Sequence, residues 1–188
     1  AAAGYPAARL VEGNDPRGID VAVLSRLPLR AYASHLRDLA PDGRLLWPRD
    51  CVEVHAEAGG RRLVVVGSHL SSALSDDGTR RVWQATRLRE IAEVVAVEDP
   101  SALVLAGGDL NDTPGSAALA ALVGDGAWID PAPAGAASWV GRSGASRLDY
   151  LLVPAGGAAL VAGASVDAGP DVPLASDHRP VVLDLRVE

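Results

Sequence analysis

Two short apolar stretches on either side of a long helical stretch constrain the fold most strongly. Residues 62–70 read RLVVVGSHL and residues 102–107 read ALVLAG, and both are typical of buried strands. Between them, residues 79–97 form an amphipathic helical pattern, which Asp77 or Thr79 could cap. The apolar residues that can share one face of this helix are Val82, Leu88, Ile91, Val94 and Val95. A strand, a helix and a second strand in this order indicate an α/β fold.

Further strands are predicted on both sides of this unit. Residues 19–25 read as a buried strand, whereas residues 1–18 and 34–48 are turn-rich and are expected to be connections. Residues 51–58 alternate between apolar and polar side chains, and Gly59-Gly60 predicts a hairpin to the next strand. Later strands are expected at residues 148–153, 160–166 and 180–187, with a short helix between Thr113 and Val123. This order predicts an α/β domain of two sheets packed face to face with helices outside.

Length and charge limit the classes of protein that the chain can belong to. It is long enough for one sizeable core, and we expect a single domain over residues 1–188. The formal net charge of −7 argues against holding nucleic acid mainly by bulk electrostatics, but leaves room for an enzyme with a local basic groove. No apolar run reaches the roughly 18 residues that a membrane span needs, and no secretory signal is visible. We therefore expect a soluble protein, either cytoplasmic or secreted after processing.

Polar side chains stand at the ends of four predicted strands, where an ordinary core would not place them. These side chains are His69, Asp109, Asn111, Asp149, Asp177 and His178. Carboxylate and carboxamide oxygens suit hard cations such as Mg²⁺ or Mn²⁺, whereas the sequence shows no cysteine cluster or close histidine pair of the kind that binds zinc. A histidine beside a carboxylate suits proton transfer near neutral pH. If these strand ends converge, the set fits attack of water on a phosphoryl centre.

Each of these residues also has a structural interpretation. A lone Gly-Asp-x-Asn around Asp109 is often an Asx turn, and a lone Ser-Asp-His around His178 is often a loop or a cap. His69 could be an edge-strand residue, and Asp149 could pair with Arg147 on the surface. The functional interpretation is favoured because all of these residues occur together, in this order and each beside an apolar strand.

The same segments resemble the endonuclease/exonuclease/phosphatase superfamily, which has the fold of pancreatic deoxyribonuclease. The matching pieces are GIDVAVLSRLP, VVVGSHL, GGDLND, SRLDYLLV and SDHRPVVLDL, in the order that the family has them. The resemblance implies a four-layer αββα sandwich, in which two sheets are flanked by helices. It also implies phosphoester hydrolysis that depends on Mg²⁺ or Mn²⁺.

The resemblance implies roles for the acidic residues and for one histidine. His178, supported by Asp149, would form the catalytic Asp-His pair. Asp109 would orient or activate the attacking water and, with Asp177, would lie on or near the metal ion. His69 would contact the phosphate or help the leaving group to depart.

Other residues are candidates for holding the substrate. The resemblance implies that Asn111 binds the scissile phosphate. Arg142 is the better candidate for a substrate contact in the segment before Asp149, whereas Trp139 could either stack on a base or anchor the loop. The arginines of residues 79–97, which are Arg80, Arg81, Arg87 and Arg89, are expected to lie mostly on a solvated face. His35 and His55 are expected at the surface, and Asp112 is expected to favour the start of the next helix.

The resemblance departs at the front of the chain. The family carries an Asn on an earlier strand and its principal metal ligand, a Glu, on a later one, and neither segment is recognisable here. Leu27 stands where pancreatic deoxyribonuclease has a Glu that supports the first histidine. We therefore expect that an N-terminal part of the fold is missing from this chain, either cut away or carried on another chain as a partner. If the chain acts alone, metal binding is expected to be weak and activity low.

Three functions follow from these observations. The leading interpretation is a metal-dependent phosphodiesterase, most simply a nuclease, whose partner is nucleic acid or another phosphoester. The second is a phosphatase or a phospholipase C-type hydrolase that acts on a small or lipid phosphoester. The third is an inactive fragment or degenerate member that keeps only the fold. Fold and catalytic core do not separate the first two, because substrate choice lies in the loops.

Overall fold

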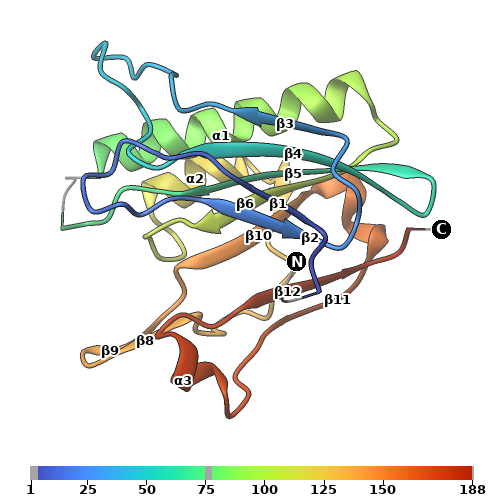
Figure 1. Cartoon of the computed structure of the whole chain (residues 1–188). Helices are drawn as coiled ribbons and strands as arrows, with labels where there is room; N and C mark the ends of the chain where they lie inside the picture. The colour runs from blue at the N-terminus through green and yellow to red at the C-terminus, as the bar shows by residue number, and fades with distance from the viewer. Residues whose placement is uncertain (1–3, 75–77, 188) are drawn as a thin grey trace.

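Six strands form a mixed central sheet in the computed structural model of the chain, which describes residues 4–74 and 78–187 (Figure 1). Their order across the sheet is β3 (Ala31–Ser34), β4 (Cys51–Ala58), β5 (Arg61–His69), β6 (Leu103–Asp109), β10 (Asp149–Pro154) and β7 (Trp128–Ile129). β5 and β6 run parallel, and the other neighbouring strands run antiparallel. The hairpin predicted at Gly59-Gly60 is confirmed, because Ala58 of β4 lies opposite Arg61 of β5.

Two helices cover one face of this sheet (Figure 1). Parallel strands need a crossover connection, and α1 (Thr79–Glu98) supplies it between β5 and β6. α2 (Ala117–Val123) packs beside α1. Leu88 of α1, Val66 of β5 and Ala106 of β6 are fully buried in one apolar core. The α/β class predicted from the strand–helix–strand order is therefore confirmed.

The remaining strands form two-stranded ribbons outside the central sheet. These are β1 (Ala7–Leu10) with β2 (Ala22–Ser25), β8 (Trp139–Gly141) with β9 (Gly144–Ser146), and β11 (Val161–Val166) with β12 (Val181–Leu185). A 3₁₀ helix, η1 (Ala155–Leu160), and a short helix, α3 (Val172–Ala175), complete the described elements. β12 packs beside β10, at the side of the central sheet that Figure 1 shows below α1. A mixed sheet with flanking helices and ribbons is the α/β sandwich class that the sequence predicts.

The first strands differ from the prediction. β1 lies inside residues 1–18, which were expected to form only turns, and the predicted strand at residues 19–25 begins at Ala22. That strand is also not buried, because Leu24 is 58% exposed. An apolar pattern does not distinguish a strand in the core from a strand in a ribbon that carries apolar side chains on its outer face.

The first helix begins at Thr79 as predicted, but the predicted start of the second helix and one predicted helix face are wrong. α1 begins after Gly78, whose φ of 102° is a backbone conformation that favours glycine. None of the described side chains caps this helix, and Asp77 lies outside the described residues. α2 begins after Ser116, whose hydroxyl accepts a hydrogen bond from Leu119 N, so Thr113 is not its cap. Val94 is 54% exposed, because Leu88, Ile91 and Val95 lie on the buried face of α1 and Val94 does not. None of the described helices is both long and apolar enough to span a membrane.

Candidate active site

The register of the central sheet brings three of the predicted residues to one edge. β5 and β6 are parallel, and His69 at the end of β5 lies opposite Asp109 at the end of β6. β10 is antiparallel to β6, so its first residue, Asp149, also lies opposite Asp109. Three side chains from three neighbouring strands therefore meet at the same place, although 80 residues of sequence separate the first from the last.

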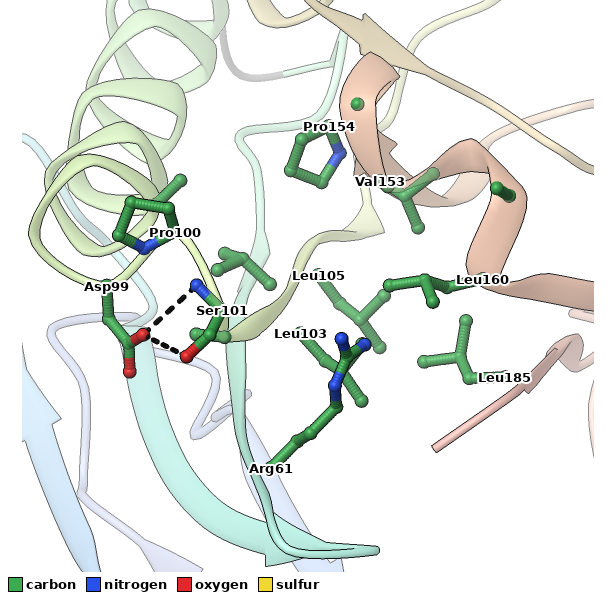
Figure 2. Close-up of a pocket in the computed structure, with 16 residues that line it drawn as sticks. Arg61, Asp99, Pro100, Ser101, Leu103, Leu105, Val153, Pro154, Leu160 and Leu185 are labelled. Atoms are coloured by element: carbon green, nitrogen blue, oxygen red, sulfur yellow. Dashed lines mark hydrogen bonds between the residues drawn. The ribbon is translucent and has the colours of Figure 1, made fainter. Parts of the chain in front are cut away.

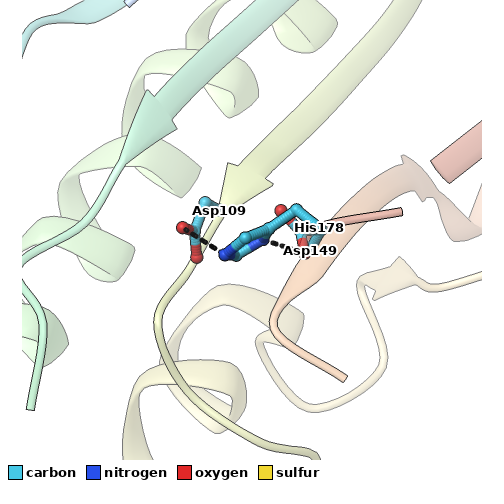
Figure 3. Close-up of side chains that lie close together, drawn as sticks. All are labelled: Asp109, Asp149 and His178. Atoms are coloured by element: carbon cyan, nitrogen blue, oxygen red, sulfur yellow. Dashed lines mark hydrogen bonds and ion pairs between the residues drawn. The ribbon is translucent and has the colours of Figure 1, made fainter. Parts of the chain in front are cut away.

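His178 reaches this edge from the segment before β12. A short backbone pairing holds the segment, because Val140 N donates to Asp177 O at 2.9 Å and Arg179 N donates to Ser138 O at 2.6 Å. The imidazole then lies between the two carboxylates (Figure 3). Its Nδ1 is 2.9 Å from Asp149 Oδ2, and its Nε2 is 4.0 Å from Asp109 Oδ2. Asp149 thus holds one ring nitrogen, and the other points toward Asp109 without a hydrogen bond to it.

Burial and neighbouring charges shift the pKa values of His69 and His178 in opposite directions. Burial lowers the pKa of His69 to about 4 in spite of the Asp109 charge, so His69 is neutral near pH 7 and its Nε2, 3.1 Å from Asp109 Oδ2, can donate a hydrogen bond. Burial also lowers the pKa of His178, but the hydrogen bond to Asp149 and the charges of Asp149, Asp109 and Asp177 together outweigh it, so this pKa lies above its usual value. Burial raises the pKa of Asp109. The site therefore holds one histidine that stays neutral and one that readily accepts a proton.

Asn111 is both part of a turn and part of the site. Its backbone N–H donates to Asp109 Oδ1 at 2.9 Å, which makes the Asx turn, and its φ is 50°. Its side-chain Nδ2 donates to Leu70 O at 2.9 Å, which anchors the carboxamide next to the end of β5. Gly108 allows β6 to lie close to β5 at this point. Its φ is 129°, and a Cβ there would overlap the carbonyl oxygen of Ser68 on β5. The Asx-turn interpretation of the Gly-Asp-x-Asn sequence is therefore confirmed, and the role of Asn111 in binding phosphate stays a prediction.

Asp177 and Arg142 lie outside this cluster, although Asp177 is the chain neighbour of His178. Asp177 Oδ2 accepts a hydrogen bond from Trp139 Nε1 at 3.1 Å, so the indole is an anchor for this carboxylate. Arg142 lies in the exposed turn between β8 and β9. The roles expected for these two residues, in metal binding and in substrate contact, stay predictions.

Two carboxylates and one imidazole of the cluster form a group that could hold a metal ion. Asp109, Asp149 and His178 each offer a ligand atom, and these atoms lie within 4.8 Å of one another. Asp149 Oδ2 already accepts two hydrogen bonds, from Ser138 Oγ at 2.7 Å and from His178. Two carboxylates at this spacing form a donor set for a hard cation.

A cavity of about 390 Å³ opens over this cluster and is lined by Asp109, Asp149 and His178 together with residues 179–181. A second cavity, of about 420 Å³, lies at the opposite end of β6 and holds none of the predicted site residues. Figure 2 shows that apolar side chains such as Leu103 and Leu160 line it, with the guanidinium of Arg61 among them. The cavity at the strand ends is the one that His178 and its two neighbouring carboxylates line.

Several polar residues are more buried than the sequence indicates. Arg81, expected on a solvated face, is buried, and its Nε donates to Asp112 Oδ2 at 3.2 Å. The expectation that Asp112 favours the start of the next helix is wrong, because α2 begins only after Ser116 and has no acidic residue in its first turn. His35 and His55, expected at the surface, lie on either side of Glu53 and contact its carboxylate. Arg81 and His35 find these partners far away in the sequence, where no local pattern reveals them.

Ser138 and Arg49 touch the site, and the sequence gives no signal for either. Ser138 is fully buried, and its hydroxyl donates to Asp149. Arg49 is buried before β4, and its NH1 donates to Leu70 O at 2.9 Å, the carbonyl that also holds Asn111. Only the folded arrangement brings these residues to the strand ends.

Comparison with known proteins shows related folds. The chain is similar to sphingomyelinase C from Streptomyces griseocarneus (21% identity, TM-score 0.64, covering 100% of this chain and 76% of that one). It is similar to beta toxin from Staphylococcus aureus (18% identity, TM-score 0.67, 98% and 79%). It is also similar to a mannosyl-6-phosphatase from Bacteroides thetaiotaomicron (16% identity, TM-score 0.68, 96% and 78%). A search of curated protein sequences found no match.

A family model gives the assignment that these distant likenesses do not give alone. The model described as the endonuclease/exonuclease/phosphatase family matches residues 2–178, which include every residue of the cluster at the strand ends. The mixed sheet, its flanking helices and the order of the matched segments agree with that fold. The chain belongs to the endonuclease/exonuclease/phosphatase family.

Proposed function

We propose that this chain hydrolyses phosphodiesters by attack of water on phosphorus, with nucleic acid as its substrate. The observation that carries the proposal is the His178–Asp149 pair, whose free ring nitrogen points toward Asp109 in an open cavity. A positioned histidine with a pKa above its usual value exchanges protons efficiently near neutral pH. The family to which the chain belongs supports the same class of reaction.

Each residue of the cluster has a distinct task in this proposal. Asp149 holds the ring of His178 in one orientation through Nδ1, which leaves Nε2 to move a proton. Asp109 orients the attacking water in the space between its Oδ2 and His178 Nε2, which are 4.0 Å apart. The carboxamide of Asn111 holds the phosphate without adding negative charge, and neutral His69 does the same once its single N–H turns from Asp109 to the bound phosphate. The exposed Arg142 contacts the substrate beyond the scissile group.

Mg²⁺ or Mn²⁺ is the cofactor that we propose. Asp109 and Asp149 would hold it, with Asp177 as a further ligand, and the ion would neutralise charge on the phosphoryl oxygens. One beta toxin structure similar in fold contains bound magnesium ions. A segment carried on another chain, if one completes the fold, would supply the further carboxylate that the family uses.

Other phosphoesters are the alternative substrates, and an inactive chain is the third outcome. The names of two proteins of similar fold, a sphingomyelinase C and a mannosyl-6-phosphatase, justify testing a lipid phosphodiester and a sugar phosphate. The net charge of −7 favours neither nucleic acid nor a lipid surface.

The test is hydrolysis by the full chain in Mg²⁺ or Mn²⁺. We expect nicking of plasmid DNA and cleavage of bis(p-nitrophenyl) phosphate, with slower release of phosphate from monoesters. His178→Ala should abolish both activities, whereas His55→Gln, which alters a histidine on β4 away from the cluster, should leave them unchanged. Mn²⁺ should raise the melting temperature of the chain and should fail to do so in Asp109→Asn. Activity that survives His178→Ala would contradict the residue assignment, and no hydrolysis of any substrate would contradict the proposed function.

A further inference from the structure

Arg49 is a buried cation directly behind the proposed phosphate site. It stands just before β4 and is 4% exposed. Its Nε donates to Asp15 Oδ2 at 3.0 Å, and its NH1 donates to Leu70 O at 2.9 Å. Both bonds reach segments that lie far from Arg49 in the sequence, so the guanidinium joins three parts of the chain.

The carbonyl of Leu70 is the link between Arg49 and Asn111. Leu70 is the first residue after β5, and its oxygen accepts from Arg49 NH1 and from Asn111 Nδ2, each at 2.9 Å. Its own N–H donates to Asp109 O at 2.9 Å, and Asn111 N donates to Asp109 Oδ1. These bonds close a ring, so the direction of the Leu70 carbonyl decides where the carboxamide of Asn111 points.

Asp15 fixes Arg49 from the other side. Its carboxylate accepts hydrogen bonds from Arg49 and from Arg17, whose Nε, NH2 and backbone N–H all donate to it. Asn14 holds the same loop against the chain before β4, because Asn14 N donates to Pro48 O at 2.7 Å. Both carboxylate oxygens of Asp15 therefore accept hydrogen bonds from Arg17 or Arg49, so Asp15 orients Arg49 and does not contact the cluster at the strand ends.

A buried ion pair is a costly way to hold one carbonyl. Removing two charges from water costs several kcal/mol, so such a pair contributes less to stability than an apolar pair would. A guanidinium, however, has donors in a rigid plane and can fix two acceptors at a set angle. This geometry suits a role in orientation more than a role in stability.

We propose that Arg49 is a positioning residue: clamped by Asp15, it orients the Leu70 carbonyl and thereby holds the Asn111 carboxamide ready for the phosphate. The inference rests on the proposed phosphodiester hydrolysis for its consequence in activity. The orientation of Asn111 itself does not depend on that function and can be observed separately.

The test compares Arg49→Met and Arg49→Lys with Arg87→Met as the matched control. Arg87 forms an ion pair with Asp38 on the helical side of the sheet and touches no residue of the cluster. The first readout is the side-chain amide signal of Asn111 in ¹⁵N NMR spectra, assigned with Asn111→Asp. The second is kcat and KM for bis(p-nitrophenyl) phosphate in Mn²⁺.

We expect Arg49→Met to shift the Asn111 signal and to lower kcat at least tenfold with a smaller change in KM. Arg49→Lys keeps the charge beside Asp15 but lacks the planar donors, so it should recover both readouts in part. Arg87→Met should change neither. Should Arg49→Met not fold, Arg49→Lys alone decides, with a shifted Asn111 signal and a kcat at least threefold below the wild type expected.

Two results would overturn the inference. One is an Asn111 signal that stays in place in the Arg49 variants, whatever happens to kcat, because Arg49 would then act only on stability. The other is wild-type kcat in every folded Arg49 variant of an active enzyme. If the wild-type chain hydrolyses nothing, the proposed function fails while the NMR readout still decides the role of Arg49.

Discussion

Ser138 has no charge, yet it sets the geometry of the charged residues around it. Its hydroxyl donates to Asp149 Oδ2 at 2.7 Å and accepts the backbone N–H groups of Leu148 and Asp149 at 2.9 and 2.8 Å. The carboxylate of Asp149 is therefore held by Ser138 on one side and by His178 on the other. The buried hydroxyl of Ser138 thus accepts the backbone N–H groups at the start of β10 and orients Asp149, the partner of the proposed catalytic histidine.

Ser138→Ala is expected to weaken both the fold and the site. The substitution leaves two partly buried N–H groups without their acceptor, and each such loss costs roughly 1–3 kcal/mol. Because two such bonds are lost, the free energy of unfolding, measured by urea denaturation, should fall by roughly 2–6 kcal/mol, and kcat should fall with it. Ser143→Ala, in the exposed turn of the β8–β9 ribbon, is the control and should change neither quantity. Unchanged stability in Ser138→Ala would show that water replaces the hydroxyl.

Asp50 gives a pH dependence that is separate from the site. Its side chain is buried, one oxygen accepts from His35 N at 3.0 Å, and the other has no hydrogen-bond partner among the described residues. Burial raises the pKa of Asp50 above its usual 3.8. Its protonated form is therefore favoured by folding, and this carboxyl costs stability as the pH rises from about 4 through the raised pKa.

Asp50→Asn should remove that cost. The variant mimics the protonated form, so its free energy of unfolding should match the wild type near pH 4 and exceed it at neutral pH. The gain is about 1.4 kcal/mol for each unit by which the pKa is raised. Urea denaturation at several pH values measures it, and a difference between the two proteins that does not grow with pH would contradict the assignment.

At the scale of elements, the β8–β9 ribbon acts as a brace for the catalytic segment. Trp139 at its start pairs with His178 through the backbone, and its indole donates to Asp177. The same indole lies directly over Gly141, where a Cβ would overlap its six-membered ring. Glycine at this position therefore lets the indole lie flat along the ribbon and reach Asp177.

Gly141→Ala is expected to displace the indole and loosen Asp177. The Nε1 signal of Trp139 in ¹⁵N NMR spectra, assigned with Trp139→Phe, should move, and kcat should fall several-fold. Stability should change little, because the ribbon is largely exposed. Ala145→Ser on the neighbouring strand serves as the control. An unmoved Trp139 signal in Gly141→Ala would show that the ribbon bends instead.

Elements with a strong local pattern were predictable, and contacts between distant segments were not. The hairpin from β4 to β5 and the helix α1 follow from alternation, from Gly59-Gly60 and from helical spacing. The meeting of Asp109 with His178 could be inferred because both stand at strand ends. The burial of Arg81 could not be inferred, because its partner Asp112 lies 31 residues away in the sequence. A charged side chain is buried only where an oppositely charged or hydrogen-bonding group lies next to it.

At the scale of the whole molecule, the two faces of the fold are covered unequally. α1 and α2 seal one face of the central sheet, whereas the other side carries narrow ribbons and the apolar cavity of Figure 2. In the β1–β2 ribbon, Ala8 lies opposite Leu24 and Leu10 lies opposite Ala22. Residues opposite one another share a face, so Leu10 and Leu24, which are 55% and 58% exposed, form an apolar strip that faces solvent.

This strip predicts that the chain associates with itself as its concentration rises. Exposed apolar residues gathered on one ribbon favour burial against another surface, whereas apolar residues scattered singly do not. Light scattering after gel filtration should show an average mass that increases with concentration. Leu24→Lys should suppress the increase by placing a charge on the strip. Val97→Lys, which changes a still more exposed apolar residue on α1, should not. If both variants associate like the wild type, the contact lies on another surface. If the wild type stays monomeric at every concentration, the strip is too small to drive association and the prediction is wrong.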